Sequence, residues 1–239
     1  MRAEKPRRVA LGEGLAKLNE NMITLAEISE MAIRKAMGGL LESDLSQAEE
    51  VSTLDREIYA LQNVIEKNCI DLIALHAPVA KDLRTITTSL KIVTDLDRIG
   101  RYARDIAEVV PELSRAGENV PRDEAKLKRM ADLTIHMVDT AIRAFTNHDA
   151  ASVRDIAEFD NAVDDLYEAL YEGYVHGITE GTLRPQVGVQ LILVSRYLER
   201  IADHAVNVGR RVVYMETGEG PAGTPRSSRP GPELPTGVG

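Results

Sequence analysis

The sequence contains one cysteine, no tryptophan, two phenylalanines and no long uninterrupted run of apolar residues. With Cys69 alone, the chain can form neither an intramolecular disulfide nor a zinc site built from several cysteines. No apolar run is long enough to span a bilayer. The basic start, Met1 to Arg8, has no apolar stretch behind it, so it does not resemble a secretory signal. We therefore expect a cytoplasmic protein.

Basic residues are also in the minority, with 29 Lys and Arg against 38 Asp and Glu and a formal net charge of −9. This balance argues against a general nucleic-acid binder, because such proteins need a basic surface to displace counterions from phosphate. Hydrophobic residues make up 44% of the 239 positions. They are mainly Ala, Leu, Ile, Val and Met, which suit helix packing better than sheet packing.

The clearest positive feature is an internal repeat. At an offset of 105 residues, Asp44 aligns with Asp149 and the segments that follow correspond. After a net loss of three residues the offset becomes 102, and Leu96-Asp97-Arg98-Ile99 aligns with Leu198-Glu199-Arg200-Ile201. A repeat of this length indicates a duplicated architecture.

Apolar residues recur at spacings of three and four, which predicts helices. We predict six, over about residues 8–43, 45–75, 78–110, 122–147, 149–178 and 183–217. Asp44 and Asp149 can cap the helices that follow them. We expect Pro78 to open the third helix and Pro111 to stop it, because proline lacks the backbone donor that a helix interior needs.

Three long helices joined by short turns pack as an antiparallel bundle. The sequence therefore predicts an all-α fold with two three-helix repeats in tandem, over residues 8–110 and 122–217. In the last segment, residues 218–239, half of the positions are Gly or Pro. We predict that this segment is a flexible tail, because it cannot bury a core or hold a helix.

Two acid-x-x-x-acid pairs in the second repeat are the strongest candidate for a functional site. The pairs are Asp160 with Asp164 and Glu199 with Asp203. Residues four apart share one helix face, so two such pairs on neighbouring helices concentrate four carboxylates. A hard cation with oxygen ligands would compensate their repulsion. We predict a metal site formed by these four residues, with a solvated acidic surface as the alternative.

The first repeat has lost half of this pattern. Its equivalent positions are Asp55, Tyr59, Asp97 and Arg101, so only Asp55 and Asp97 remain acidic. Arg101 lies four residues from both Asp97 and Asp105, where a guanidinium can neutralise carboxylates without metal. We predict a degraded site that binds metal weakly or not at all.

Other sequence motifs give weaker evidence for a function. The chain has no HExxH or Glu-x-x-His pattern, which weighs against a ferritin-like di-iron oxidase, and no phosphate-binding glycine loop or nucleophile elbow. His204 directly follows Asp203 and points about 100° away around the helix. We expect it to support a ligand or to lie at the surface rather than to bind metal. For Asp82 and Arg84 we expect capping and ion pairing near the start of the third helix.

Several of these segments together resemble the PhoU family, over roughly residues 15–218. The resemblance is carried by Pro78-Val79-Ala80-Lys81-Asp82-Leu83-Arg84, Asp97-Arg98-Ile99-Gly100, Tyr197-Leu198-Glu199-Arg200-Ile201-Ala202-Asp203-His204-Ala205 and Val212-Val213-Tyr214-Met215-Glu216-Thr217-Gly218. It implies two three-helix bundles related by pseudo-twofold symmetry. It also implies multinuclear metal sites on the acid-x-x-x-Asp motifs, for which we expect iron or zinc.

The same resemblance implies a function. Members of the family are cytoplasmic negative regulators of phosphate uptake and phosphate signalling, and they are not known as enzymes. They contact the ATPase subunit of a phosphate-specific ABC transporter and, in many bacteria, a sensor histidine kinase. We therefore expect a non-enzymatic homodimer that binds no nucleic acid and touches the membrane only through partners. The alternatives are a metal-dependent carboxylate-bridged enzyme, a metal-storage bundle, or a helical scaffold whose acids are only surface charge.

Overall fold

The structure is a computed structural model that describes residues 4–117 and 124–219. Over these residues the chain forms six α-helices and one short 3-10 helix, with no strand, which confirms the all-α prediction. The helices are α1 (Glu4–Glu42), α2 (Leu45–His76), α3 (Ala80–Ala116), α4 (Glu124–Thr146), α5 (Ile156–Thr179) and α6 (Pro185–Thr217), with η1 (Ser152–Asp155) directly before α5. From Gly220 onward, the predicted tail lies outside the described residues.

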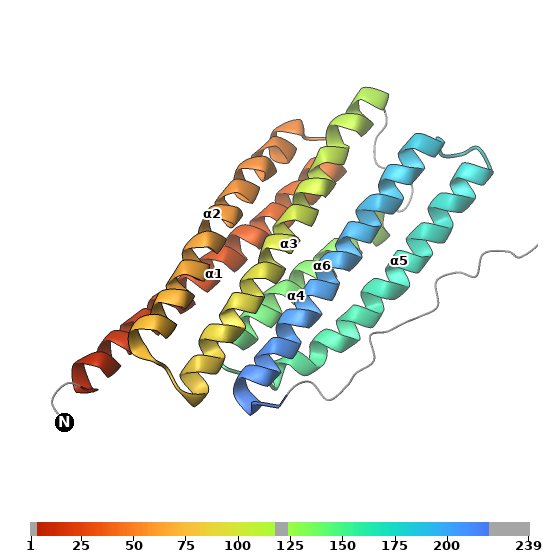
Figure 1. The fold of residues 1–239 in the computed structure, drawn as a ribbon. Helices are drawn as coiled ribbons and strands as arrows, with labels where there is room; N and C mark the ends of the chain where they lie inside the picture. Colours follow the sequence, from red (N-terminus) through yellow and green to blue (C-terminus); the bar gives the residue numbers. More distant parts are fainter. Residues whose placement is uncertain (1–3, 118–123, 220–239) are drawn as a thin grey trace, which may run out of the picture.

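The helices form two three-helix bundles that lie side by side (Figure 1). The first bundle contains α1, α2 and α3, and the second contains α4, α5 and α6. Between the bundles, α3 packs along α6 and α1 packs along α4, while α2 and α5 lie on opposite outer sides. Equivalent helices of the two repeats therefore meet each other, as pseudo-twofold symmetry requires.

α3 and α6 run antiparallel along their shared interface. Near the start of α3, Arg84 Nε donates a hydrogen bond to the carbonyl oxygen of Met215 near the end of α6, at 3.0 Å. Towards the other end of the pair, Gln190 of α6 donates to Glu112 of α3. Because α3 and α6 are equivalent in the two repeats and run antiparallel, the pseudo-twofold axis passes between equivalent residues at the middle of their contact.

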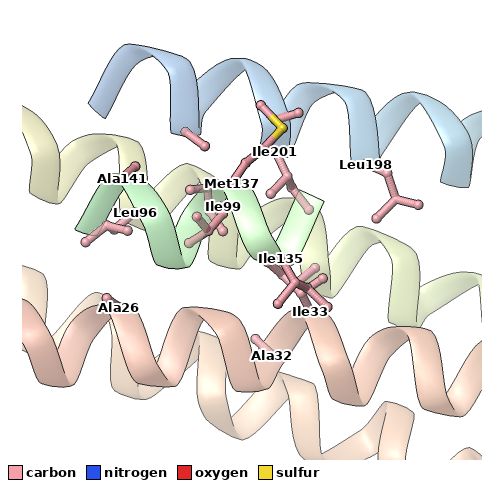
Figure 2. Close-up of a cluster of buried hydrophobic side chains, with 14 of the residues drawn as sticks. Ala26, Ala32, Ile33, Leu96, Ile99, Ile135, Met137, Ala141, Leu198 and Ile201 are labelled. Atoms are coloured by element: carbon pink, nitrogen blue, oxygen red, sulfur yellow. The ribbon is translucent and has the colours of Figure 1, made fainter. Parts of the chain in front are cut away.

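One hydrophobic core runs through both bundles. At its centre, four helices contribute buried side chains (Figure 2). The labelled ones are Ala26, Ala32 and Ile33 of α1, Leu96 and Ile99 of α3, Ile135, Met137 and Ala141 of α4, and Leu198 and Ile201 of α6. Because apolar burial is the main favourable term in folding, this shared core holds the two repeats together as one packed unit.

Matching aspartates open the second segment of each repeat. Asp44 and Asp149 each accept hydrogen bonds from the backbone amides two and three residues further on, at 2.9 and 3.4 Å in both copies. The preceding residues, Ser43 and His148, both have left-handed φ angles, of 57° and 55°. Asp44 caps α2, as predicted. In the second copy Asp149 instead opens a turn that leads into η1, so α5 begins only at Ile156.

The two prolines of the third segment do not act as predicted. α3 begins at Ala80, two residues after Pro78, and it continues through Pro111 as far as Ala116. The expectations that Pro78 opens this helix and that Pro111 stops it were therefore wrong. Proline removes one hydrogen bond from a helix interior. Here the following turn carries Leu113, which is buried in the core, and this packing keeps the helix intact.

α2 and α3 approach closely where Ile58 meets Gly100. A Cβ atom on Gly100 would lie 2.5 Å from Cδ1 of Ile58, so no larger residue fits there without a shift. At the equivalent positions of the second repeat the chain carries Val163 and Ala202, both fully buried. One copy thus pairs a larger side chain with glycine, and the other pairs a smaller one with alanine, which keeps the filled volume similar.

This exchange predicts strong coupling between Ile58→Val and Gly100→Ala. Ile58→Val alone should cost about 1 kcal/mol of unfolding free energy. Gly100→Ala alone combines an overpacking cost of about 1–3 kcal/mol with a helix-propensity gain of about 1 kcal/mol. The double variant recreates the Val163–Ala202 pair, so it should be at least about 1 kcal/mol more stable than the sum of the single effects. Urea denaturation of the four proteins tests this, and additive losses would contradict it.

Candidate metal site and the interface between the bundles

The four predicted acids of the second repeat come together across α5 and α6. Asp160 and Asp164 lie on α5, Glu199 and Asp203 lie on α6, and all four are half-buried. α5 is anchored by buried side chains at roughly seven-residue intervals, including Val163, which fixes the direction in which its acids point. The acids are close enough to perturb one another, as the pKa values of Asp160 and Glu199 show.

The pKa of Asp160 is raised to about 6, chiefly by burial and also by the negative charges of Asp164 and Asp203, against the opposing effect of Arg210. Asp203 belongs to the neighbouring helix, so its effect on the pKa of Asp160 indicates that the two acidic pairs lie close together. Like charges in a partly desolvated site favour the protonated form. Such a shift is typical of functional sites, although ion-pair networks produce it as well.

The carboxyl group of Glu199 is perturbed in the same direction. Burial raises the pKa of its carboxyl group to about 7, even though Arg196 and Arg200 oppose the shift. Arg196 Nη1 lies 2.6 Å from Glu199 Oε2, and Arg200 Nη1 lies 2.9 Å from Asp203 Oδ2. The Oε2 atom of Glu199 is buried and accepts no hydrogen bond, so the contact with Arg196 is an ion pair without hydrogen-bond geometry. Sequence analysis missed both arginines, although their spacing of three residues from each acid was visible.

The donor chemistry of these residues fits a hard cation, since four carboxylates supply oxygen ligands and one buried oxygen lacks a hydrogen bond. Their present arrangement does not enclose one. Over residues 4–117 and 124–219, no group of three or more His, Cys, Asp or Glu side chains is placed to hold a metal ion. Two of the four acids are instead engaged by arginines. The metal site therefore stays a prediction.

In the first repeat, arginines occupy the equivalent region. Arg101 Nε lies 3.0 Å from Asp97 Oδ2, which is the predicted ion pair. A second arginine, Arg104, bridges from α3 to Asp55 of α2 at 3.1 Å and also contacts Asp105 at 3.3 Å. The sequence pattern did not indicate Arg104, and the spacing of four residues had suggested Arg101 as the partner of Asp105. Two cations thus neutralise the two acids left from the pattern.

A second polar cluster lies between the bundles. Asp95 of α3 is buried, with a side chain only 5% exposed, and it reaches across to two residues of α6. Its Oδ1 lies 2.9 Å from Nδ1 of His204, and its Oδ2 lies 3.0 Å from Nε of Arg211. His204 is therefore an interface residue with a side chain 12% exposed, so the expected surface position was wrong, and its hydrogen-bond partner is Asp95 rather than one of the predicted metal ligands.

The opposite side of the symmetry axis carries a different contact. Tyr102 of α3 stacks on Tyr197 of α6, with ring centroids 5.9 Å apart. At the offset of 102, Asp95 corresponds to Tyr197 and Tyr102 corresponds to His204. The contact of Asp95 with His204 and the aromatic contact therefore occupy symmetry-related places, and their different chemistry distinguishes the two bundles.

The ends of α3 and α6 are also tied together. Arg84 caps the last turn of α6 through Met215, rather than an element next to it in the sequence. Glu216 accepts from Lys81 at 3.3 Å and contacts Nδ1 of His148 at 2.6 Å. Burial raises the pKa of Glu216, but the hydrogen bonds from His148 and Lys81 outweigh it, so the pKa is lowered. These contacts fix the junction of the bundles at one end.

None of the helices in the described part of the chain combines the length and apolarity needed to cross a membrane. A sequence model of the PhoU domain matches residues 22–110 and 127–212, which is one match in each repeat. The chain is 32% identical to a Synechocystis sp. phosphate-specific transport system accessory protein PhoU homolog, over 90% of this chain and 94% of that protein. It is also 32% identical to PhoU homolog 2 of Mycobacterium tuberculosis, over 90% of this chain and all of that protein.

Solved structures give the same result. PhoU from Pseudomonas aeruginosa superposes with a TM-score of 0.83 at 28% identity, over 87% of this chain and 99% of that chain. The phosphate transport system regulatory protein PhoU from Streptococcus pneumoniae superposes with a TM-score of 0.80 at 29% identity, over 88% and 98%. Two domain matches, full-length relatives and two similar structures agree, and this chain belongs to the PhoU family.

Proposed function

We propose that this protein is a regulator of phosphate uptake and phosphate signalling, and that it acts through protein contacts rather than catalysis. The observation that carries this proposal is the completeness of the match, which includes both repeats and nearly the whole length of relatives named as accessory proteins of phosphate-specific transport. Its partners would be the ATPase subunit of a phosphate-specific ABC transporter and a sensor histidine kinase. It would act in the cytoplasm, as a homodimer and as a negative regulator.

Affinity purification from phosphate-replete and phosphate-starved cells tests this proposal. We expect the transporter ATPase or the kinase to co-purify, with a yield that depends on phosphate supply. Deletion of the gene should raise expression of a phosphate-starvation reporter in phosphate-replete cells, because a negative regulator would be absent. If neither partner co-purifies and the reporter does not respond to the deletion, the proposed function is wrong.

We also propose that Asp160, Asp164, Glu199 and Asp203 bind a hard cation, with iron or zinc as the expected metal. The support is the gathering of four carboxylates on α5 and α6 and their mutual effect on pKa. A bound cation would supply positive charge that links the two helices. At Asp55 and Asp97, two arginines already supply that charge, so we expect weak metal binding there or none.

Metal content is the measurement that checks this pair of sites. Asp164→Asn with Asp203→Asn should remove most of the metal that the purified protein retains after equilibration with zinc or iron, because half of the carboxylate ligands are lost. Asp55→Asn with Asp97→Asn is the matched control and should leave the metal content almost unchanged. Mass spectrometry measures the metal content of each purified variant. Equal losses of bound metal in both variants would contradict the predicted difference in metal binding between the two repeats.

The runner-up functions are a metal-dependent enzyme and a metal store. The same metal-loaded samples can be screened for hydrolase and oxidase turnover and for the number of ions bound to each chain. Turnover that disappears in the Asp164→Asn and Asp203→Asn variant would favour the enzyme. Binding of many ions to each chain would favour the store.

A further inference from the structure

Arg196 and Arg200 form ion pairs with Glu199 and Asp203, which are two of the four predicted metal ligands. Each arginine lies three residues before its acid on the same helix and contacts one carboxylate oxygen of that acid. Nε of Arg200 also lies 3.9 Å from Glu199, which links the two ion pairs. A divalent cation at the same oxygens would be repelled by these guanidinium groups.

Both arginines are able to leave. Their side chains are 37% and 43% exposed, and partly exposed ion pairs of this kind contribute little to stability. The guanidinium carbon of Arg196 also lies 5.6 Å from the ring centroid of Tyr167, a contact that it can keep without Glu199. Release therefore needs only side-chain rotation.

The sequence of the other repeat supports a link between Arg196 and the full acidic set. The position equivalent to Arg196 in the first repeat is Thr94, whereas Arg200 has an equivalent in Arg98, and the first repeat has only two of the four acids. There, Arg101 and Arg104 hold the remaining acids instead. In the second repeat the cations stand beside the acids without replacing any of them, which leaves all four carboxylates present for an ion.

We propose that Arg196 and Arg200 are internal counterions of the candidate metal site, and that a cation must displace them before Glu199 and Asp203 can bind it. This inference rests on the proposed metal site. The two arginines hold the acids in place in the metal-free protein, and they set its affinity for metal through competition. They act on the metal through Glu199 and Asp203, so they are positioning residues.

The experiment is a zinc titration by isothermal calorimetry, with wild type and variants of equal melting temperature. Arg196→Gln with Arg200→Gln should tighten zinc binding by about tenfold or more, because the competing charges are removed. Arg196→Lys with Arg200→Lys should stay within about threefold of wild type, since the charges are kept. Arg143→Gln is the matched control, because Arg143 forms a 2.7 Å ion pair with Asp139 on α4, and its affinity should equal that of wild type.

A purely structural role for the arginines would leave zinc affinity unchanged or would weaken it in the glutamine variant, and either result overturns the inference. If wild type binds zinc and the glutamine variant binds it no more tightly, the inference fails while the metal site stands. If no variant binds zinc, both the inference and the metal site fail. The co-purification experiment tests the regulation of phosphate transport separately.

In NMR spectra, the Nε–H signals of Arg196 and Arg200 should shift on zinc addition, and unchanged signals in a zinc-bound protein would also overturn the inference.

Discussion

Replacing Asp95 by alanine is expected to lower the free energy of unfolding by about 2–3 kcal/mol, somewhat less than the cost of breaking a fully buried ion pair. Asp95 is the buried member of the contact with His204 and Arg211, and its side chain is 5% exposed. Without it, two polar groups of α6 face a hydrophobic interface with no acceptor from α3. The loss is smaller than for a fully buried pair because the Arg211 side chain is 29% exposed and can turn to solvent.

Thermal and urea denaturation measure this loss, and the melting temperature should fall by about 5–10 °C for a chain of this size. Asp132→Ala is the matched control, because Asp132 is exposed on α4 and should change stability by less than about 0.5 kcal/mol. In a double-mutant cycle, His204→Ala should cost less in the Asp95→Ala background than in wild type. If Asp95→Ala is as mild as Asp132→Ala, the contact does not hold the bundles together.

The second large effect is a dependence of stability on pH in the presence of chelator. The pKa of Asp160 is about 6 in the folded protein, compared with an ordinary value of 3.8 in the unfolded chain. The pKa of Glu199 is about 7 in the folded protein, compared with an ordinary value of 4.5. Between pH 4 and pH 7 the folded protein therefore holds protons that the unfolded chain has lost. Stability contributed by these two groups is fully present at low pH and is lost as pH rises through the folded pKa values.

A full conversion at about 1.36 kcal/mol for each pKa unit would overstate this loss, because both groups are partly exposed to solvent. We expect about 1 kcal/mol from each group after this allowance for solvent screening. Asp160→Asn with Glu199→Gln should then be about 2 kcal/mol more stable than wild type at pH 8, and equal to it near pH 4. Glu57→Gln, at an exposed position of α2, is the control and should show no such difference. A variant that is less stable than wild type at pH 8 without metal would contradict the prediction.

Much of the fold could be predicted from the sequence because its signals are local. Asp44 ends one helix and caps the next within a few residues, and the apolar spacing of each helix is set by its own periodicity. The prediction failed at Pro111, where the local rule for proline was overridden by the burial of Leu113 in the core. Which helices pack together is a tertiary property, and only the short turns within each repeat and the internal repeat itself bore on it.

In the candidate site too, contacts within one helix could be predicted from the sequence, and contacts between helices could not. The ion pair of Arg101 with Asp97 joins residues four apart on one helix, so spacing was enough to predict it. Arg104 reaches Asp55 across 49 positions of sequence, and His204 reaches Asp95 across 109. Nothing in the spacing of such residues marks them as partners. Their contacts appear only when the helices are placed side by side.

The pairing of α3 with α6 and of α1 with α4 has an evolutionary consequence. Each repeat meets its counterpart through the same two helices, which is the geometry of two identical subunits in a symmetrical dimer. A duplication that joined such subunits into one polypeptide would leave two copies of every contact, each free to change without the other. One now holds the side-chain hydrogen bond between Asp95 and His204, and the other holds the stack of Tyr102 on Tyr197. Two identical chains cannot make that division, since any substitution in one subunit appears in both.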